Sequence, residues 1–335
     1  MTKGHSQHKK IIQVAVAVIQ YEQDGQVQYL LGTRHAHQHQ GGKLEFVGGK
    51  IEQHETAKAA LIREVREELG LDIGECAIVK MGRIGHDYAE KSVCLHIYQV
   101  SLSKAQYLEF QHKTVGSDGQ KIGFYDLASV VSQKDDFPDA NAPIFTWLSL
   151  PKVVVVSHEL SFFKNKTDWL DCYKKVPSGS TLLMRTFAST QANAWMMAEL
   201  DEAVENLKFV ISWQDAALGR KNILAVRLTQ NELMSLDLKN LCLPNSPIIA
   251  SCHDDAGIIK VNELAKQHPV MAITLSPVKP TQTHPNAPHL GWESFAKLAF
   301  MSNVPVIALG GLSPTDLNIA RSYGAVAVAG IRGFI

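Results

Sequence analysis

Eight short apolar runs follow one another in the second half of the chain. They are Val153–Val156, Thr181–Met184, Phe209–Ile211, Ile223–Val226, Ile248–Ser251, Met271–Thr274, Pro305–Leu309 and Ala325–Ala329. Segments with a helical pattern separate most of them, for example Gln191–Leu207, Ala256–Gln267 and Trp292–Ser302. Regular alternation of eight strands with helices predicts a (β/α)8 barrel.

The first half has a different pattern, and the change lies near Pro151. Val14–Ile19, Tyr29–Gly32 and Ser92–Ser101 have the alternation of strands, and Thr56–Leu69 has the apolar stripe of a helix that ends at Gly70. We therefore expect a chain of the α/β and α+β classes. An α+β domain with a mixed sheet would occupy residues 1–149, and the barrel would occupy residues 150–335.

The barrel is expected to lack its last helix, because only a few residues, ending at Gly333-Phe334-Ile335, follow the eighth run. The outer faces of the eighth and first strands would then be open. Exposing such an apolar patch to water is unfavourable, at roughly 25 cal/mol per Å². We expect the first domain or a second subunit to cover it, so an oligomer stays open as an alternative.

Charge and cysteine content exclude several classes of protein. The 335 residues include 33 Lys+Arg and 33 Asp+Glu, so the formal net charge is zero. This balance argues against direct binding to nucleic acid or to an anionic membrane, and no apolar run is long enough for a membrane span. The five cysteines form no CxxC pair. We expect a reduced, cytoplasmic protein.

Three carboxylates fall on one face of the predicted helix over Thr56–Leu69. Glu64, Glu67 and Glu68 are spaced i, i+3, i+4. Like charges at this spacing destabilise a bare helix, and a hard divalent cation such as Mg²⁺ or Mn²⁺ would remove the repulsion. The alternative is a solvated charged face with incidental glutamates. Gly48-Gly49, just before the helix, can bring the backbone close to a ligand.

The full pattern around these glutamates is Gly49-x5-Glu55-x7-Arg63-Glu64-U-x-Glu67-Glu68-x-Gly70-U, where U is apolar. It resembles the Nudix box. The resemblance implies that Glu64, Glu67 and Glu68 are catalytic metal ligands, joined by the Gly48 carbonyl, and that Arg63 pairs with Glu55 to brace the helix. It also implies cleavage of X-linked nucleoside diphosphates by attack of a metal-activated water on phosphorus.

Two further segments, Lys43–Glu52 and Asp135–Pro143, resemble the MutT type of this family, the 8-oxo-dGTP diphosphatases. The resemblance implies that Asn141 contacts the oxidised base and that Arg34 and Lys50 lie on the phosphate side. Together with Phe46, they are the four implied substrate contacts: Arg34, Phe46, Lys50 and Asn141. It gives Asp118 the place of a further metal ligand or base, where the family has Glu. The alternative for Asn141 is that it only shapes a turn.

The segment from Pro305 to Gly311, with Gly324-Ala325 and Ala329–Gly333, is similar to thiamine-phosphate synthase and its TenI-like relatives. The resemblance implies that Gly310, Gly311, Gly330 and Arg185 contact the phosphate of a thiamine-like ligand. The alternative is that the glycines only allow tight turns. Ser212-Trp213-Gln214 replaces the synthase's Asn-Asp-Arg, and Thr281–His284 lacks its Lys, so we do not expect synthase activity.

These expectations combine into one leading hypothesis and two alternatives. The leading hypothesis is a Mg²⁺-dependent or Mn²⁺-dependent pyrophosphohydrolase that converts 8-oxo-dGTP to 8-oxo-dGMP and pyrophosphate, in the family's role of cleansing the nucleotide pool and avoiding mutation. One alternative keeps the chemistry and makes a thiamine-pathway pyrophosphate the substrate. The other is a regulatory protein whose barrel senses a ligand.

Overall fold

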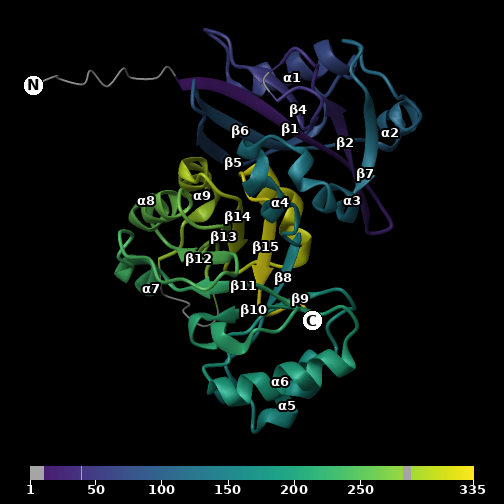
Figure 1. Cartoon of the computed structure of the whole chain (residues 1–335). Coiled ribbons are helices and arrows are strands. Elements are labelled where there is room, and N and C mark those ends of the chain that lie inside the picture. Colours follow the sequence, from purple (N-terminus) through teal and green to yellow (C-terminus); the bar gives the residue numbers. More distant parts are fainter. Residues whose placement is uncertain (1–10, 39, 282–287) are drawn as a thin grey trace, which may run out of the picture. The chain divides into compact units, whose positions relative to one another are not determined.

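The computed structural model describes residues 11–38, 40–281 and 288–335. The chain forms two compact units, Met1–Leu148 and Ser149–Ile335, and each is described by itself (Figure 1). Of the segment Thr281–His284, only Thr281 lies within the described residues. No helix in the described part of the chain combines the length and the apolar character needed to cross a bilayer. All five cysteines are free thiols.

The first unit contains a mixed sheet and short helices. Its elements are β1 (Ile11–Gln23), β2 (Gln26–Thr33), β3 (Leu44–Glu45), β4 (Val47–Lys50), α1 (Ala57–Leu69), β5 (Ala77–Asp87), β6 (Ser92–Ser101), α2 (Lys104–Phe110), β7 (Ile122–Asp126), α3 (Leu127–Ser132), the 3-10 turns Lys134–Asp136 and Asp139–Asn141, and α4 (Ala142–Leu148).

The strand order is β3-β2-β1-β6-β5, with β4 also on β1 and β7 on β2. β1 and β6 run parallel, whereas the other pairs are antiparallel. This confirms the predicted mixed sheet. β1 is longer than the predicted strand, Val14–Ile19, because Ile11–Gln13 also pair with β6 and Gln20–Gln23 also pair with β2.

Helix α1 forms where the sequence predicts it. The Thr56 hydroxyl caps its start by accepting a hydrogen bond from the Ala59 amide at 3.1 Å, and Gly70 ends it in the left-handed conformation, with φ 70°. Its buried residues, Ala60, Leu61, Val65 and Leu69, pack into the core together with residues of β1, β2 and β4. Burying this stripe fixes which face of α1 carries the glutamates.

The second unit is a closed barrel of eight parallel strands, in the order β10-β11-β12-β13-β14-β15-β8-β9. The strands are β8 (Val153–Val156), β9 (Thr181–Leu183), β10 (Lys208–Ser212), β11 (Ile223–Leu228), β12 (Ile248–Cys252), β13 (Val270–Leu275), β14 (Val306–Leu309) and β15 (Ala327–Gly330). Every predicted run contributes one strand, so the predicted (β/α)8 barrel is confirmed.

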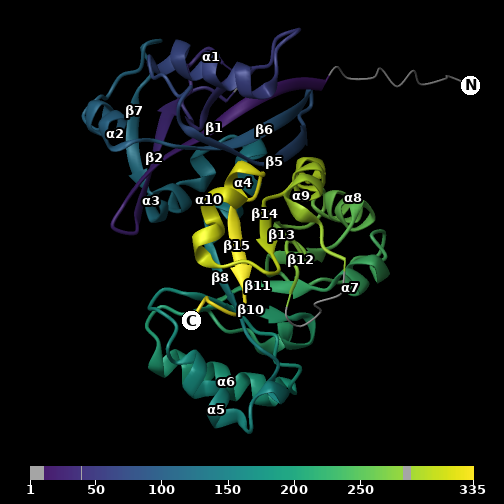
Figure 2. The same ribbon diagram turned by 180° about the vertical axis from the view of Figure 1, so that it is seen from behind.

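Short helices connect the barrel strands. They are α5 (Lys166–Tyr173), α6 (Thr190–Ala203), α7 (Gln230–Ser235), α8 (Asp255–Leu264), α9 (Gly291–Met301) and α10 (Leu317–Ser322), with 3-10 turns at Leu160–Phe162, Trp213–Leu218 and Pro314–Asp316. A 3-10 turn, Trp213–Leu218, is the connection between β10 and β11, which keeps the unit small. α5 and α6 lie side by side in both views (Figures 1 and 2).

The described residues after β15 form no helix, as predicted. They fold back instead, and Phe334 is only 6% exposed. Its ring packs on Gly330, where an added Cβ would lie 2.3 Å from a ring carbon. Gly330 therefore has a packing role at the end of β15.

Candidate active site

The glutamate face of α1 lies against the glycines of β4. The Glu64 side chain is 15% exposed and approaches Gly49 so closely that an added Cβ there would lie 2.1 Å from the Glu64 Cδ. A Cβ on Gly48 would lie 2.1 Å from the Ala15 carbonyl oxygen. Only glycine at both positions lets β4 pass between β1 and the Glu64 carboxylate.

Arg63 is the centre of a group of ion pairs on this helix. Its Nη2 lies 2.7 Å from Glu55 Oε1, and its Nη1 lies 2.8 Å from Glu64 Oε1 and 3.2 Å from Glu67 Oε2. Nη2 also donates to the Lys50 carbonyl oxygen at 3.1 Å. The hydrogen bonds that Glu55 accepts from Arg63 and from the Glu52 amide hold the pKa of Glu55 below its usual value. Arg63 therefore ties the loop before α1 to the helix and orients two of its glutamates.

Glu68 carries the least favourable charge of the group. Burial raises its pKa to about 8, and the negative charges of Glu45, Glu64 and Asp118 add to the effect, while a backbone hydrogen bond from Gly48 opposes it. Three carboxylates thus lie close enough to Glu68 to repel its charge. A cation placed among them would stabilise the ionised form.

The four side chains of this group fit a hard divalent cation, because each offers carboxylate oxygens. They belong to Glu45, Glu64, Glu68 and Asp118. Within the described residues, no three His, Cys, Asp or Glu side chains already stand at the spacing of a closed metal site. Arg63 pairs with Glu64 and Glu67 in their present positions. A metal ion would therefore compete with this guanidinium for the same oxygens.

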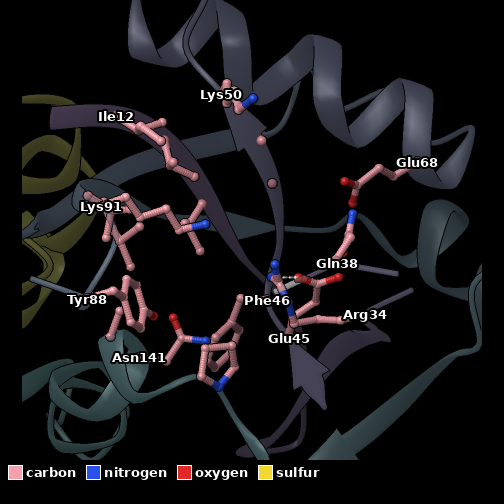
Figure 3. A pocket seen from close by; sticks show the side chains of 18 residues that line it. Ile12, Arg34, Gln38, Glu45, Phe46, Lys50, Glu68, Tyr88, Lys91 and Asn141 are labelled. Carbon is pink, nitrogen blue, oxygen red and sulfur yellow. Dashed lines mark hydrogen bonds and ion pairs between the residues drawn. The ribbon is translucent and has the colours of Figure 1, made fainter. Parts of the chain in front are cut away.

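A cavity of about 250 Å³ opens beside Glu68. Its polar lining includes Arg34, Gln38, Glu45, Lys50, Glu68, Tyr88, Lys91 and Asn141. In Figure 3, Arg34 and Glu45 meet on the side toward Glu68, whereas Asn141 and Tyr88 lie on the other side. The cavity therefore joins a charged end, near α1, to a less charged end.

Six of the predicted site residues line this cavity: Arg34, Phe46, Gly48, Lys50, Glu68 and Asn141. Arg63, Glu64, Glu67 and Asp118 do not line it. Of these four, Glu67 and Asp118 are exposed. The structure therefore places six of the predicted residues in the lining of the cavity and leaves Arg63, Glu64, Glu67 and Asp118 outside it.

The less charged end of the cavity is shaped by aromatic rings. Phe46 is 4% exposed, and its ring centre lies 5.4 Å from that of Phe137. Asn141 is 6% exposed, and its backbone amide donates to the Pro138 carbonyl oxygen at 2.8 Å, which closes the 3-10 turn. The turn thus presents the amide side chain of Asn141 to a space bounded by Phe46 and Tyr88.

Four residues of the site were not singled out from the sequence: Glu45, Tyr88, Lys91 and Gln120. Glu45 forms a close ion pair with Arg34, and after burial its negative charge is the largest cause of the raised pKa of Glu68. Its position next to Phe46 in the Lys43–Glu52 segment was a usable signal. Tyr88 and Lys91 come from the turn between β5 and β6, and no sequence pattern relates them to α1.

The predicted barrel glycines sit where the backbone needs them. Gly310 and Gly311, after β14, have φ values of 101° and 69°. Added Cβ atoms would lie 2.7 Å from Pro277 Cβ and 2.6 Å from the Pro280 carbonyl oxygen. These close contacts explain both glycines by packing alone. The contact with Phe334 explains Gly330 in the same way. Phosphate binding by their amides stays a prediction.

Positive charges gather at the carboxyl ends of the barrel strands. Arg185 follows β9, and its guanidinium lies 5.1 Å from the centre of the exposed Phe187 ring. Burial and the charges of Arg332 and Arg185 lower the pKa of His158, which follows β8. Arg227, on β11, also has a lowered pKa, because of burial and in part because of Arg185. Such a rim favours an anionic ligand.

The first unit matches the family model described as "NUDIX domain" over residues 12–148. It is similar to the 8-oxo-dGTP diphosphatase of Proteus vulgaris, at 33% identity over 30% of this chain and 86% of that protein. It is also similar to the 8-oxo-dGTP diphosphatase of Escherichia coli (strain K12), at 29% identity over 42% of this chain and 97% of that protein.

The second unit matches the family model TMP-TENI, "Thiamine monophosphate synthase", over residues 189–334. It is similar to the putative thiamine-phosphate synthase 2 of Aquifex aeolicus (strain VF5), at 36% identity over 19% of this chain. The match spans only 34% of that protein. The chain belongs to the Nudix family, and residues 189–334 of the same polypeptide match the model of the thiamine monophosphate synthase family.

Proposed function

We propose that the protein is a Mg²⁺-dependent nucleoside triphosphate pyrophosphohydrolase that converts 8-oxo-dGTP to 8-oxo-dGMP and pyrophosphate. One observation carries the proposal. A single cavity has Arg34 on the side toward Glu68 and Asn141 on the other side, and Phe46 also lines it. The side with Arg34 and Glu68 suits a phosphate chain with its metal, and the side with Asn141 suits a flat, hydrogen-bonding base. The similarity to two 8-oxo-dGTP diphosphatases supports the same assignment.

The charged end would hold the phosphate chain. Glu64, Glu67 and Glu68, with Asp118 and the Gly48 carbonyl, would hold divalent cations. When bound, such cations neutralise phosphate charge and activate water for attack on phosphorus. Arg34 and Lys50 line the cavity and would pair with phosphate oxygens. Arg63 would keep the loop before α1 tied to the helix through its ion pair with Glu55.

The other end would select the base. Guanine presents an acceptor at N7, whereas oxidation at C8 places a hydrogen on N7 and makes it a donor. The Asn141 side chain offers both an accepting oxygen and a donating NH₂ group to the edge of the base. Phe46 would pack against the base from the side, since it lines the same space. Discrimination would then rest on Asn141.

Product analysis tests this proposal directly. The full-length protein should release 8-oxo-dGMP and pyrophosphate from 8-oxo-dGTP with Mg²⁺, and excess EDTA should stop the reaction. Separating the products by ion-exchange chromatography distinguishes pyrophosphate from two phosphates. Release of inorganic phosphate alone, or hydrolysis that persists in EDTA, would refute the proposed reaction.

Glu45 should affect KM through its ion pair with Arg34. Replacing Glu45 with Gln removes the charge that holds the guanidinium at the cavity. A hydrogen bond between charged groups contributes about 1.5–3 kcal/mol, so we expect KM for 8-oxo-dGTP to rise by about tenfold or more. Steady-state kinetics measure it, with the exposed Glu75→Gln as the matched control. An unchanged KM in a folded Glu45→Gln protein would show that Arg34 needs no such partner.

A second function of the barrel is favoured by its positive rim. Arg185, Arg332 and Arg227 would bind a phosphorylated, thiamine-like ligand there. This motivates the other substrate hypothesis, in which the Nudix site cleaves a thiamine-pathway pyrophosphate. A ligand-sensing barrel is the remaining alternative. Isothermal titration of full-length protein with thiamine phosphate tests the site, and Arg185→Ala should abolish any binding seen.

Synthesis of thiamine phosphate is not expected from this barrel. Ser212 stands where the synthase has its first metal-pyrophosphate ligand, and its hydroxyl donates instead to Asp215 Oδ2 at 2.8 Å. Asn193 donates to the same oxygen at 2.8 Å, and Asp215 is 1% exposed. The nearby carboxylate is therefore held inside the fold. Full-length protein assayed by fluorescence beside an authentic synthase should give no product, and measurable synthesis would refute this.

A further inference from the structure

We propose that Gln120 is a positioning residue of the carboxylate site. Its side chain fastens the segment Gly116–Gln120 to the C-terminal end of α1 and thereby holds the Asp118 carboxylate beside Glu68. The inference rests on the proposed function only in treating these carboxylates as a divalent-metal site. It does not depend on which nucleotide is hydrolysed.

The first observation concerns the Glu68 carbonyl. It belongs to the last four carbonyls of α1, which have no partner within a helix. Three N–H groups from one distant segment converge on it. The backbone amides of Ser117 and Asp118 lie 2.7 Å and 3.4 Å away, and Gln120 Nε2 lies 2.9 Å away. The segment is therefore docked onto the residue that carries the buried carboxylate.

The second observation is how tightly the segment is built. The Gly116 amide donates to the Gln120 carbonyl oxygen at 2.8 Å, and Gly119 turns the chain with φ 81°. An added Cβ on Gly116 would lie 2.5 Å from Gln120 Oε1, and one on Gly70 would lie 2.8 Å from Ser117 Oγ. The segment closes around the amide of Gln120, and a side chain on Gly116 or Gly70 would displace it.

The third observation is that the side-chain amide of Gln120 leaves its oxygen buried without a hydrogen-bond partner among the described residues. Gln120 as a whole is 7% exposed. An apolar side chain of the same length would fill this space without an unpaired oxygen. Packing alone therefore does not explain glutamine here. The Nε2 group, which donates to Glu68, supplies the reason.

Asp118 depends on this anchor because it reaches the site from the segment alone. It lies two residues before Gln120, its side chain is exposed, and its negative charge acts on Glu68. Asp has a shorter side chain than Glu, so its carboxylate moves out of reach if the backbone shifts. Loss of the Gln120 bond should therefore weaken metal binding rather than substrate binding.

The test replaces Gln120 with Met and, in a second variant, with Leu. Both keep the volume and remove the donor. We expect the dissociation constant for Mn²⁺, measured on the full-length protein by electron paramagnetic resonance without nucleotide, to rise by about tenfold. kcat should fall with little change in KM. Gln133→Met is the matched control, because Gln133 Nε2 donates at 3.1 Å to the Ser129 carbonyl oxygen at the end of α3.

A double variant shows whether the effect passes through Asp118. In an Asp118→Asn background, Gln120→Met should weaken Mn²⁺ binding no further. Wild-type Mn²⁺ affinity in a folded Gln120→Met or Gln120→Leu protein would overturn the inference, and so would an undiminished loss in the Asp118→Asn background. Failure to hydrolyse 8-oxo-dGTP would refute the proposed substrate and leave this measurement intact.

Discussion

Replacing Glu68 with glutamine should reduce Mg²⁺-dependent hydrolysis by about a thousandfold or more, because the variant loses a carboxylate oxygen of the proposed metal site at the cavity. The fold should survive. The negative charge of Glu68 is disfavoured by burial and by three neighbouring carboxylates, so its removal relieves repulsion in the metal-free protein. We therefore expect a melting temperature no lower than that of the wild type, measured by calorimetry in EDTA.

Glu67→Gln should also nearly abolish turnover, although Glu67 lies on the exposed side of α1 and contacts Arg63. The exposed Glu75→Gln serves as the control for both variants. Wild-type turnover by a folded Glu68→Gln or Glu67→Gln protein would show that the carboxylate face is not the metal site.

Replacing Asn141 with alanine should raise KM for 8-oxo-dGTP far more than KM for dGTP. A lost contact between the amide and the base is worth about 1–3 kcal/mol, or about 5-fold to 150-fold in discrimination. The backbone bond from Asn141 to Pro138 remains in the variant, so the 3-10 turn should persist. Steady-state kinetics with both nucleotides measure the ratio.

Asn141→Asp provides the matched comparison, since it keeps the side-chain shape and an accepting oxygen. It should retain more of the selectivity than Asn141→Ala. Equal losses for 8-oxo-dGTP and dGTP in the alanine variant would instead mean that Asn141 only shapes the turn.

The barrel could be predicted from the sequence because its signal is local. Most of its strands are short apolar runs with both faces buried, as in Ile248–Cys252, where every residue is buried. Helix α1 could be predicted equally well, because its N-cap residue, its apolar residues and the glycine that ends it are contiguous in the sequence. The extra length of β1 could not be predicted, because Ile11–Gln13 and Gln20–Gln23 are held as strand by β6 and β2, which the local sequence does not reveal.

Only part of the candidate site could be predicted, because only some of its residues lie close together in the sequence. Glu64, Glu67 and Glu68 are recognisable by spacing on one helix, and the structure places all three on α1, with only Glu68 in the lining of the cavity. Lys91 reaches the cavity from the β5–β6 turn, so only the tertiary fold relates it to Glu68.

The barrel glycines could be recognised in the sequence, but their role could not be predicted from it. Gly310 was open to two explanations from the sequence, a phosphate contact or a tight turn. The structure supplies a packing reason for it through Pro277, which leaves its ligand role to experiment. A motif alone does not distinguish a glycine that approaches a ligand from one that approaches another part of the chain.

The most direct test of the proposed function is the specificity constant. kcat/KM of the full-length protein with Mg²⁺ should be compared for 8-oxo-dGTP, dGTP and thiamine pyrophosphate. The cavity, with Asn141 at one end and Glu68 at the other, predicts the highest value for 8-oxo-dGTP, with 8-oxo-dGMP and pyrophosphate as products. A higher value for thiamine pyrophosphate, or equal values for 8-oxo-dGTP and dGTP, would contradict it.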